Sequence, residues 1–586
     1  MISERISGGR ESRKMTQESE KRMRVSKKKF ICLALAALMA ACLPGCGKAL
    51  SKPKKGDSVA PNLNTAPFTS EQKLLETGVC TPVSSTQPSR FGFETHLNVN
   101  GIDVDGFYRQ NEIHFSGKNY AQIKGVLTFR GDNYRSSGAY GVANMTSYKL
   151  AKAWNIDTGS LKKTVKKGEW TGSGWTGQPL LVQWDDATRK AMNLYDSKKN
   201  KSGLVEVIYA TMDGNIYFLD LDDGSATRPK ISLGFPIKGT GSLYPNGIPL
   251  YAVGAGDDMG KKAARTFLVS LVTGEVLYEY GAEDPFSIRT DNGNFCAFDS
   301  SPLFDAETDT IIQPGENGIL YTMKLNTKWD GTTLTIDPAE IVKWNYKTDR
   351  TGNDTYWLGM ESSACAYDHY LYICDNSGDL MCIDVNTMEL IWSQDIVDDS
   401  NASPVLEVDP ATGTAYIYVS TSLHWTANKR KTGDIPIFKI NAATGEIIWK
   451  REYSCKTVDG VSGGVQATAC LGENNLSGLV YFNIARTGGK KHGKFVAIDK
   501  KTGGEVWSVD MKYYSWSSPV AVYNSNGDGY IILCDSDGNM HLLDGRTGKV
   551  KDTINLGKNI EATPSVFNNT VVVGTRGKKI YGVTLK

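Results

Sequence analysis

The chain has 586 residues, of which 40% are hydrophobic and 22% charged, so it is long enough to bury a large core. Its formal net charge is +2, but residues 1–45 alone carry ten basic and four acidic residues, which leaves a weakly acidic remainder. Such a balance provides no basic patch of the kind that binds nucleic acid, and no nucleic-acid partner is expected.

Residues 1–45 are typical of a bacterial lipoprotein signal peptide. A basic run at 24–29 precedes a short apolar stretch at 30–42, which is too short to span a membrane comfortably. The sequence LPGC that follows resembles a lipobox and ends at Cys46. We therefore expect lipidation of Cys46 and a lipid-anchored protein at the cell membrane, facing the extracytoplasmic side. The alternative is an ordinary cleaved signal in which Cys46 is incidental.

The next two segments lead into a repetitive region. Residues 46–70 are rich in Lys, Pro, Ser and Asn and predict a flexible tether. Residues 71–147 hold short strand-like pieces such as FETHLNVN and predict a small β-rich N-terminal segment packed on the main domain. Residues 148–586 form the main domain, in which one pattern recurs.

The recurring phrase consists of two apolar residues, Asp or Asn, a Thr three positions later, Gly, and an aromatic residue five positions after the Thr. The clearest copies run from Asp384 to Trp392, from Asn441 to Trp449 and from Asp499 to Trp507, with weaker copies at 220–224, 273–278 and 544–552. Each copy predicts a strand, a tight turn and a strand. The Asp and Thr side chains would cap the turn, the Gly would adopt positive φ, and the Trp would pack between neighbouring sheets.

A second landmark divides the region into eight units. A small polar residue or pair, followed by Pro or another small residue, precedes the expected first strand at Gln178, Ile248, Ser301, Ser363, Ser403, Thr468, Ser518 and Thr563. Each interval holds about four short strands, and helical patterns are nearly absent. The sequence therefore predicts an all-β fold, an eight-bladed β-propeller of four-stranded antiparallel blades.

The two ends of this region are complementary. The last unit begins near Glu561 and lacks the strand that carries the Thr-Gly and aromatic positions, so its outer edge would be unpaired. The segment around Trp154 is an orphan strand of the missing type. We expect residues 148–157 to complete the final blade and close the ring.

The phrase D-x-x-T-G-x-x-x-W, carried by residues 384–392, 441–449 and 499–507, resembles the repeat of quinoprotein-type (PQQ-like) propellers over roughly residues 148–586. The stretch TFRGDNYR at 128–135 is similar to the Arg-rich lead-in before the first blade of such proteins. The resemblance implies one of two functions. Some members are dehydrogenases of alcohols or sugars that hold pyrroloquinoline quinone and usually calcium on the axis. Others are lipoproteins that serve as docking scaffolds, such as the propeller lipoprotein of the outer-membrane assembly machinery.

The sequence favours the scaffold. It has no adjacent cysteine pair and no haem-attachment motif, and a Glu, Asn and Asp ligand set cannot be aligned. We therefore expect a monomeric, non-catalytic propeller that binds an envelope protein, a peptide or another envelope component, with no catalytic residue, metal or cofactor. The alternatives are a dehydrogenase with quinone and calcium, and a propeller that binds cell-wall glycan. The Asp- and Asn-rich stretches at 524–528 and 535–539 are better explained as hairpin turns than as calcium loops.

A ligand would most simply bind where the innermost strands begin, because these positions line the axial mouth of a propeller. The candidate axial-mouth residues are Gln178, Asp299, Glu361, Gln466 and Glu561. The alternative is that they hydrogen-bond neighbouring backbone. The candidate surface-binding aromatics are Trp170, Trp175, Trp357 and Trp425, and each could equally be an inter-blade Trp.

Eight cysteines follow the leader, scattered and mostly within apolar strands, which predicts buried thiols. Cys374 and Cys382 flank one expected hairpin. A two-residue turn at 377–378 would set Cys374 opposite Met381 and turn Cys382 to the other face, which argues against a disulfide.

Overall fold

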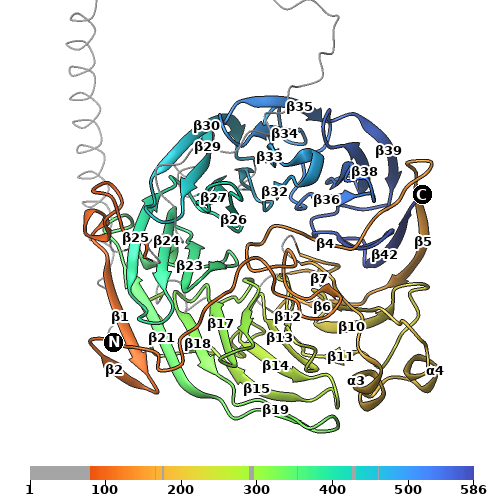
Figure 1. The fold of residues 1–586 in the computed structure, drawn as a ribbon, viewed down its shortest axis with the longest axis horizontal. Helices are drawn as coiled ribbons and strands as arrows, with labels where there is room; N and C mark the ends of the chain where they lie inside the picture. The colour runs from red at the N-terminus through yellow and green to blue at the C-terminus, as the bar shows by residue number, and fades with distance from the viewer. Residues whose placement is uncertain are drawn as a thin grey trace, which may run out of the picture. The chain divides into compact units, whose positions relative to one another are not determined.

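The computed structural model describes residues 79–164, 167–174, 177–289, 296–352, 354–424, 431–458 and 461–586. The signal peptide, the tether and Cys46 lie outside these residues. The described residues all belong to one compact unit. Its described part is a ring of eight blades, which confirms the predicted all-β, eight-bladed propeller (Figure 1).

The blades follow one another in chain order, and their strands run from the axis outward with antiparallel pairing. Blade 1 consists of β8 (Leu180–Val182), β9 (Glu206–Ala210), β10 (Asn215–Asp220) and β11 (Ile231–Ser232), and blade 2 consists of β12 (Ser242–Leu243), β13 (Leu250–Gly254), β14 (Thr266–Ser270) and β15 (Val276–Tyr280). Blade 3 consists of β16 (Leu303–Asp305), β17 (Thr310–Pro314), β18 (Leu320–Lys324) and β21 (Ala339–Lys347), and blade 4 consists of β22 (Cys365–Tyr367), β23 (Tyr370–Cys374), β24 (Asp379–Asp384) and β25 (Leu390–Asp395).

Blades 5 to 8 continue the ring. Blade 5 consists of β26 (Val405–Val408), β27 (Ala415–Ser420), β29 (Thr432–Asn441) and β30 (Ile447–Lys456). Blade 6 consists of β32 (Cys470–Leu471), β33 (Leu479–Ala485), β34 (Gly493–Asp499) and β35 (Glu505–Met511), and its sheet also includes β28 (Ser422–Leu423) and β31 (Gly463–Gly464). Blade 7 consists of β36 (Val520–Tyr523), β37 (Gly529–Cys534), β38 (Asn539–Asp544) and β39 (Val550–Asn555), and blade 8 consists of β40 (Ser565–Phe567), β41 (Thr570–Thr575), β42 (Lys579–Leu585) and β5 (Leu150–Asp157).

The N-terminal segment is distributed over this ring. β1 (Glu94–Val99) and β2 (Ile102–Val104) extend blade 3 beyond β21, while β3 (Gly125–Val126) and β4 (Ala139–Tyr140) lie beside the inner strands of blades 1 and 8. The remaining elements are the hairpins β6 (Ser160–Lys162) with β7 (Glu169–Thr171) and β19 (Lys328–Trp329) with β20 (Leu334–Thr335), and the helices α3 (Asp186–Ala191), α4 (Asp196–Lys199), η1 (Pro88–Phe91), η2 (Thr355–Trp357) and η4 (Asn474–Leu476). Among the described residues, no helix has both the length and the apolar character needed to cross a membrane.

The repeated phrase forms the contact between neighbouring blades. Asn441 Oδ1 accepts hydrogen bonds from two backbone N–H groups of its own turn, as predicted for a capped turn. Gly445 in that turn has φ +74°, and a Cβ there would lie 2.7 Å from the indole of Trp392 in the preceding blade. Trp392 Nε1 donates to Ala442 O at 3.0 Å. The same arrangement places Trp449 on Gly503 and Trp507 on Gly548, with the turns capped by Asp499 and Asp544.

The ring closes as predicted. β5 pairs antiparallel with β42, with Trp154 opposite Gly582, and completes blade 8 (Figure 1). Trp154 then docks on blade 1 as the other Trp residues dock on theirs, because its Nε1 donates to Leu221 O at 2.8 Å and its indole lies against Gly224. Blade 7 has Asp552 in place of the Trp, and this side chain accepts a hydrogen bond from the Leu150 N–H at the start of β5.

Hydroxyl groups at the entrances of the inner strands form a belt around the axis. The backbone N–H at one entrance donates to the hydroxyl of the next, at distances from 2.8 to 3.1 Å, in the pairs Ser301 to Ser363, Ser363 to Ser403, Ser403 to Thr468 and Thr468 to Ser518. These are the predicted landmarks. The landmark at Ile248 was wrong by one strand, because the first strand of blade 2 is the two-residue β12, which precedes it.

The Arg-rich lead-in forms a plug on one side of this belt. Arg135 is fully buried and donates from Nε to Ala364 O at 2.8 Å and from Nη2 to Ser301 O at 2.9 Å. Arg130 is equally buried and donates to Pro519 O and Ala469 O. The chain leading to β4 accordingly crosses the centre of the ring (Figure 1). Arg135 therefore joins blades 3 and 4, and Arg130 joins blades 6 and 7.

The cysteines outside the leader are all buried, and none forms a disulfide in the part of the chain that the structure describes, as the sequence predicts. The expected register of the hairpin at Cys374 was wrong by one residue. Cys374 lies opposite Leu380, and Tyr372 lies opposite Cys382. The reason is Asp375, whose Oδ1 accepts hydrogen bonds from three successive N–H groups and holds a wider turn than the one predicted.

Candidate functional site

A pocket of about 290 Å³ lies at the axial mouth, on the side of the belt away from the plug. Its position follows from the belt. Glu361 and Gln466 line the pocket two residues before belt residues, whereas Ala364 and Ala469 face the plug one residue after them. The lining is Lys238, Glu316, Tyr356, Trp357, Glu361, Asn376, Asn401, His424, Val461, Ser462, Gln466 and Trp516.

Three buried carboxylates gather at this mouth. Oxygen atoms of Asp299, Glu316 and Glu361 lie within 4.8 Å of one another. Asp299 and Glu361 each precede an inner strand by a few residues, and Glu316 lies in the turn between β17 and β18. Neither Asp299 oxygen accepts a hydrogen bond from any described residue. Such a set of oxygen atoms is of the kind that binds a cation, either a metal ion or a protonated amine.

The carboxylates perturb one another. Burial raises the pKa of Asp299 to about 7, with Glu316 adding to the shift and Lys238 opposing it. Burial, followed by the charges of Glu316 and Asp299, also raises the pKa of Glu361 well above its usual range. A bound cation would relieve this repulsion, because an opposite charge nearby favours the ionised form of a carboxyl group.

The cations of the mouth are already engaged. Lys238 Nζ lies 3.6 Å from Asp299, and Arg289 Nη1 lies 2.8 Å from Glu316 Oε1. Asp399 adds a further buried carboxylate beside the pocket, where its Oδ2 lies 2.6 Å from His424 Nδ1. Carboxyl groups therefore outnumber cations at the mouth, and a cation that binds there would favour their ionised forms.

Aromatic rings form the rim. Trp357 follows Tyr356 in η2, with ring centroids 5.1 Å apart, and its ring meets that of His424 edge-on at 5.3 Å. Trp516 lines the pocket from the connection between blades 6 and 7. Aromatic faces combined with carboxylates are the combination that recognises a positively charged group.

One further pair invites a catalytic interpretation. His424 is bonded to Asp399, and Ser462 lies in the sequence GVSGG directly beyond the paired residues Leu423 and Gly463. In the described part of the chain, however, no hydrogen bond joins Ser462 to His424, and no helix follows the serine as in a nucleophile elbow.

The structure divides the predicted axial-mouth residues. Glu361 and Gln466 line the pocket, and Asp299 belongs to its carboxylate group. Glu561 lies four blades from Glu361, where its Oε1 accepts from Asn559 Nδ2 at 2.6 Å. Gln178 belongs to the plug side: its Oε1 accepts from the Arg130 N–H, and its Nε2 donates to Pro564 O.

The predicted surface aromatics also have different positions. Trp357 is on the rim of the mouth. Trp170 is half-buried in β7, and Lys163 Nζ lies 3.9 Å from the centre of its ring. Trp175 and Trp425 lie outside the described residues.

Sequence reasoning missed several residues of the pocket. Glu316 and Asn376 occupy the same position in two hairpins, two residues before the turn glycines Gly318 and Gly378. These segments were predicted as turns, and their polar residues were not proposed to face the axis. Their shared register was the available signal, since a polar residue at one place in successive blades faces one place on the axis. Lys238, Asn401 and Trp516 lie in connections between blades and have no such signal.

Comparison with known proteins supports the repeat. Residues 491–586 match the family model described as outer membrane protein assembly factor BamB, over part of blade 6 and all of blade 7 and the C-terminal strands of blade 8. This match confirms the resemblance of the repeat to quinoprotein-type propellers. No curated protein matches the chain.

Solved structures to which this chain is similar include BamB from Moraxella catarrhalis, with TM-score 0.43 and 15% identity over 69% of this chain and 96% of that one. Quinohemoprotein alcohol dehydrogenase from Comamonas testosteroni has TM-score 0.40 and 13% identity over 80% and 81%. A europium-containing methanol dehydrogenase has TM-score 0.39 and 13% identity over 79% and 98%.

Proposed function

We propose that this protein is a non-catalytic binding scaffold of the cell envelope, held at the membrane by a lipid on Cys46, and that its axial mouth receives a Lys or Arg side chain of an envelope protein. The observation that supports this most strongly is the excess of buried carboxylates in an aromatic-rimmed pocket. A guanidinium or ammonium group would donate hydrogen bonds to several oxygens at once and favour the ionised forms of these carboxyl groups.

A protein partner suits the mouth better than a free small cation. The rim presents Tyr356 and Trp357 beside the exposed side chain of Val461, so apolar surface surrounds the polar centre. Interfaces commonly place large aromatic anchors around a central charged contact, because the aromatic groups exclude water from it. A side chain that enters the mouth would therefore arrive with apolar neighbours that cover this rim.

The residues present do not fit pyrroloquinoline quinone. That cofactor is itself an anion, because its rings carry carboxylate groups, and it needs cations around it. The mouth offers Lys238 and Arg289, and each already forms an ion pair with a carboxylate of the pocket. The quinone would thus meet carboxyl groups without an unpaired cation to balance its own charge. The repeat describes the fold, and the site must be judged by its own residues.

The test uses the full-length protein in its native membrane. We expect Trp357→Ala and Glu361→Gln to release a captured partner without lowering Tm, while Tyr195→Ala, which alters an exposed aromatic residue elsewhere, retains it. Replacing the partner's buried Lys or Arg by Gln should release it equally.

Equal capture by all variants would contradict the proposed site. Micromolar binding of quinone with calcium, accompanied by dye reduction, would replace the proposal with the dehydrogenase, and labelling of Ser462 by a serine-reactive phosphonate would replace it with a hydrolase. Cys46→Ser should move the protein out of the membrane fraction, and retention there would refute the anchor.

A further inference from the structure

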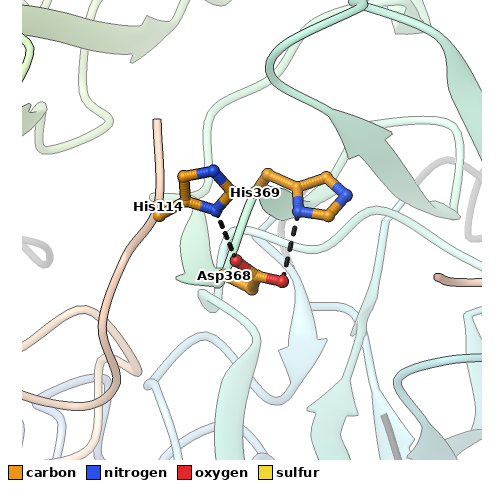
Figure 2. Close-up of side chains that lie close together, drawn as sticks. All are labelled: His114, Asp368 and His369. Carbon is orange, nitrogen blue, oxygen red and sulfur yellow. Dashed lines mark hydrogen bonds and ion pairs between the residues drawn. The ribbon is translucent and has the colours of Figure 1, made fainter. Parts of the chain in front are cut away.

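A second group of titratable side chains lies on blade 4, where the N-terminal segment crosses it. His114 comes from that segment, and Asp368 and His369 come from the turn between β22 and β23 (Figure 2). His114 Nδ1 lies 2.8 Å from Asp368 Oδ1, and His369 Nδ1 lies 3.2 Å from Asp368 Oδ2. The carboxylate thus stands between two imidazole rings that are far apart in the sequence.

The backbone fixes these residues in place. Phe115 and Asp368 form an isolated antiparallel bridge, in which the Phe115 N–H donates to Asp368 O at 2.8 Å and the Asp368 N–H donates to Phe115 O at 3.2 Å. Asn386 adds a second clamp, because its side chain accepts from the Ile113 N–H and donates to Ile113 O. His114 and Asp368 are therefore brought together by main-chain bonds, independently of any attraction between their side chains.

The outward nitrogen of each ring faces a further carboxylate. His114 Nε2 lies 3.1 Å from Glu112 Oε2, and His369 Nε2 lies 3.7 Å from Asp384 Oδ2. Histidines that bind metals commonly donate their other N–H to a carboxylate, which fixes the tautomer and orients the free nitrogen toward the ion. His114 makes this hydrogen bond with Glu112, whereas Asp384 lies near His369 Nε2 only at ion-pair distance. In both rings Nδ1 is directed at the Asp368 carboxylate.

We propose that His114, Asp368 and His369 bind a divalent transition-metal ion, Zn²⁺, and that the ion fastens the N-terminal segment to blade 4. Imidazole nitrogen and carboxylate oxygen are ligands that zinc accepts. The three ligand atoms lie within 4.8 Å of one another. Tetrahedral geometry at ordinary Zn–N and Zn–O distances needs separations of about 3.4 Å, so small side-chain movements close the site.

Charge and access agree with this site. Glu112, Asp368 and Asp384 place three carboxylates around the two imidazoles, so a doubly charged cation offsets their negative charge. The His114 side chain is 52% exposed, which leaves an entry path and room for water as the fourth ligand. The spacing of histidines along the sequence gave no sign of this site, because the chain returns to it only after the whole of blades 1 to 3.

The test measures Zn²⁺ binding to the full-length protein, stripped with a chelator and then titrated at pH 7.5 against a chromogenic competitor. We expect one strongly bound ion per chain and at least a 100-fold loss of affinity in His114→Ala and Asp368→Asn. Glu112→Gln, which removes an outer carboxylate and no ligand, should cost roughly 10-fold. His492→Ala is the matched control, because it removes a histidine in another blade.

Two further readouts separate a metal site from a structural contact. Co²⁺ bound to the wild type should give the visible absorption bands of a tetrahedral ion, and these should be missing in His114→Ala at an unchanged Tm. Zn²⁺ should also slow amide exchange at Ile113 and Phe115 in the wild type alone. Equal affinity in the wild type and His114→Ala, or a loss of affinity in His492→Ala as large as in His114→Ala, would overturn the proposal.

Discussion

Replacing Trp154 tests the closure of the ring. Its side chain is 8% exposed, lies against Gly224 of blade 1 and Gly582 of β42, and donates a hydrogen bond to Leu221 O. Truncating a buried Trp to Ala costs about 3–5 kcal/mol. Trp154→Phe keeps most of the packing but leaves the Leu221 carbonyl without its donor, which costs about 1–3 kcal/mol. We therefore expect both variants to unfold at lower urea concentrations than the wild type, with Trp154→Ala the less stable of the two.

The strand that loses its protection from amide exchange distinguishes a role of Trp154 in ring closure from a general role in packing. Trp392→Ala is the matched control, because Trp392 docks on blade 5 in the same way but lies in a continuous part of the chain. Amide exchange followed by mass spectrometry should show Lys579–Leu585 opening in Trp154→Ala and remaining protected in Trp392→Ala. A Trp154→Ala protein within about 0.5 kcal/mol of wild type, or with β42 as protected as in the control, would refute closure by β5.

Three further changes probe other parts of the structure. Gly445→Ala should lower the free energy of unfolding, measured in urea, by about 1–3 kcal/mol more than Gly413→Ala does, because both glycines have positive φ but only a Cβ at position 445 would collide with Trp392. Equal losses in the two variants would contradict the docking of Trp392 on this turn. Arg135→Met should cost at least about 3 kcal/mol, since it leaves buried carbonyls without donors, and a stable variant would show that the plug is dispensable. Burial lowers the pKa of Lys439 to about 7 from an unfolded value of 10.5, so the unfolded state binds more protons between these pH values. The free energy of unfolding should therefore gain about 2–3 kcal/mol from pH 7 to 9 in the wild type, and Lys439→Met should lose this slope; an unchanged slope would assign it to other groups.

The ring was predictable because its determinants are local and repeated. The turn at Asn441, the glycine at 445 and the Trp at 449 recur at fixed offsets, so their roles could be assigned before any contact was known. Closure by residues 148–157 followed from a missing strand at one end and an orphan strand at the other. The N-terminal segment was less predictable, because β1 pairs with the outer strand of blade 3 and neither β1 nor β2 carries a copy of the repeat.

The site was only partly predictable. Glu361 and Gln466 could be named because they precede inner strands, which fixes their height along the axis. Lys238 and Asn401 come from irregular connections, whose path depends on tertiary packing. The plug shows the same limit: Arg130 and Arg135 were noticed as a motif, but their hydrogen bonds join blades hundreds of residues away.

The most direct test of the account places a photo-crosslinking residue at position 357, on the rim of the axial mouth, or at position 550, an exposed position on the outer strand β39. Both proteins are expressed in the native host and irradiated. We predict a crosslink to one envelope protein from position 357 that disappears when Glu361→Gln is added, and none from position 550. A partner captured from position 550 alone would contradict the account, because it would place binding on the outer surface of the ring instead of at its axis.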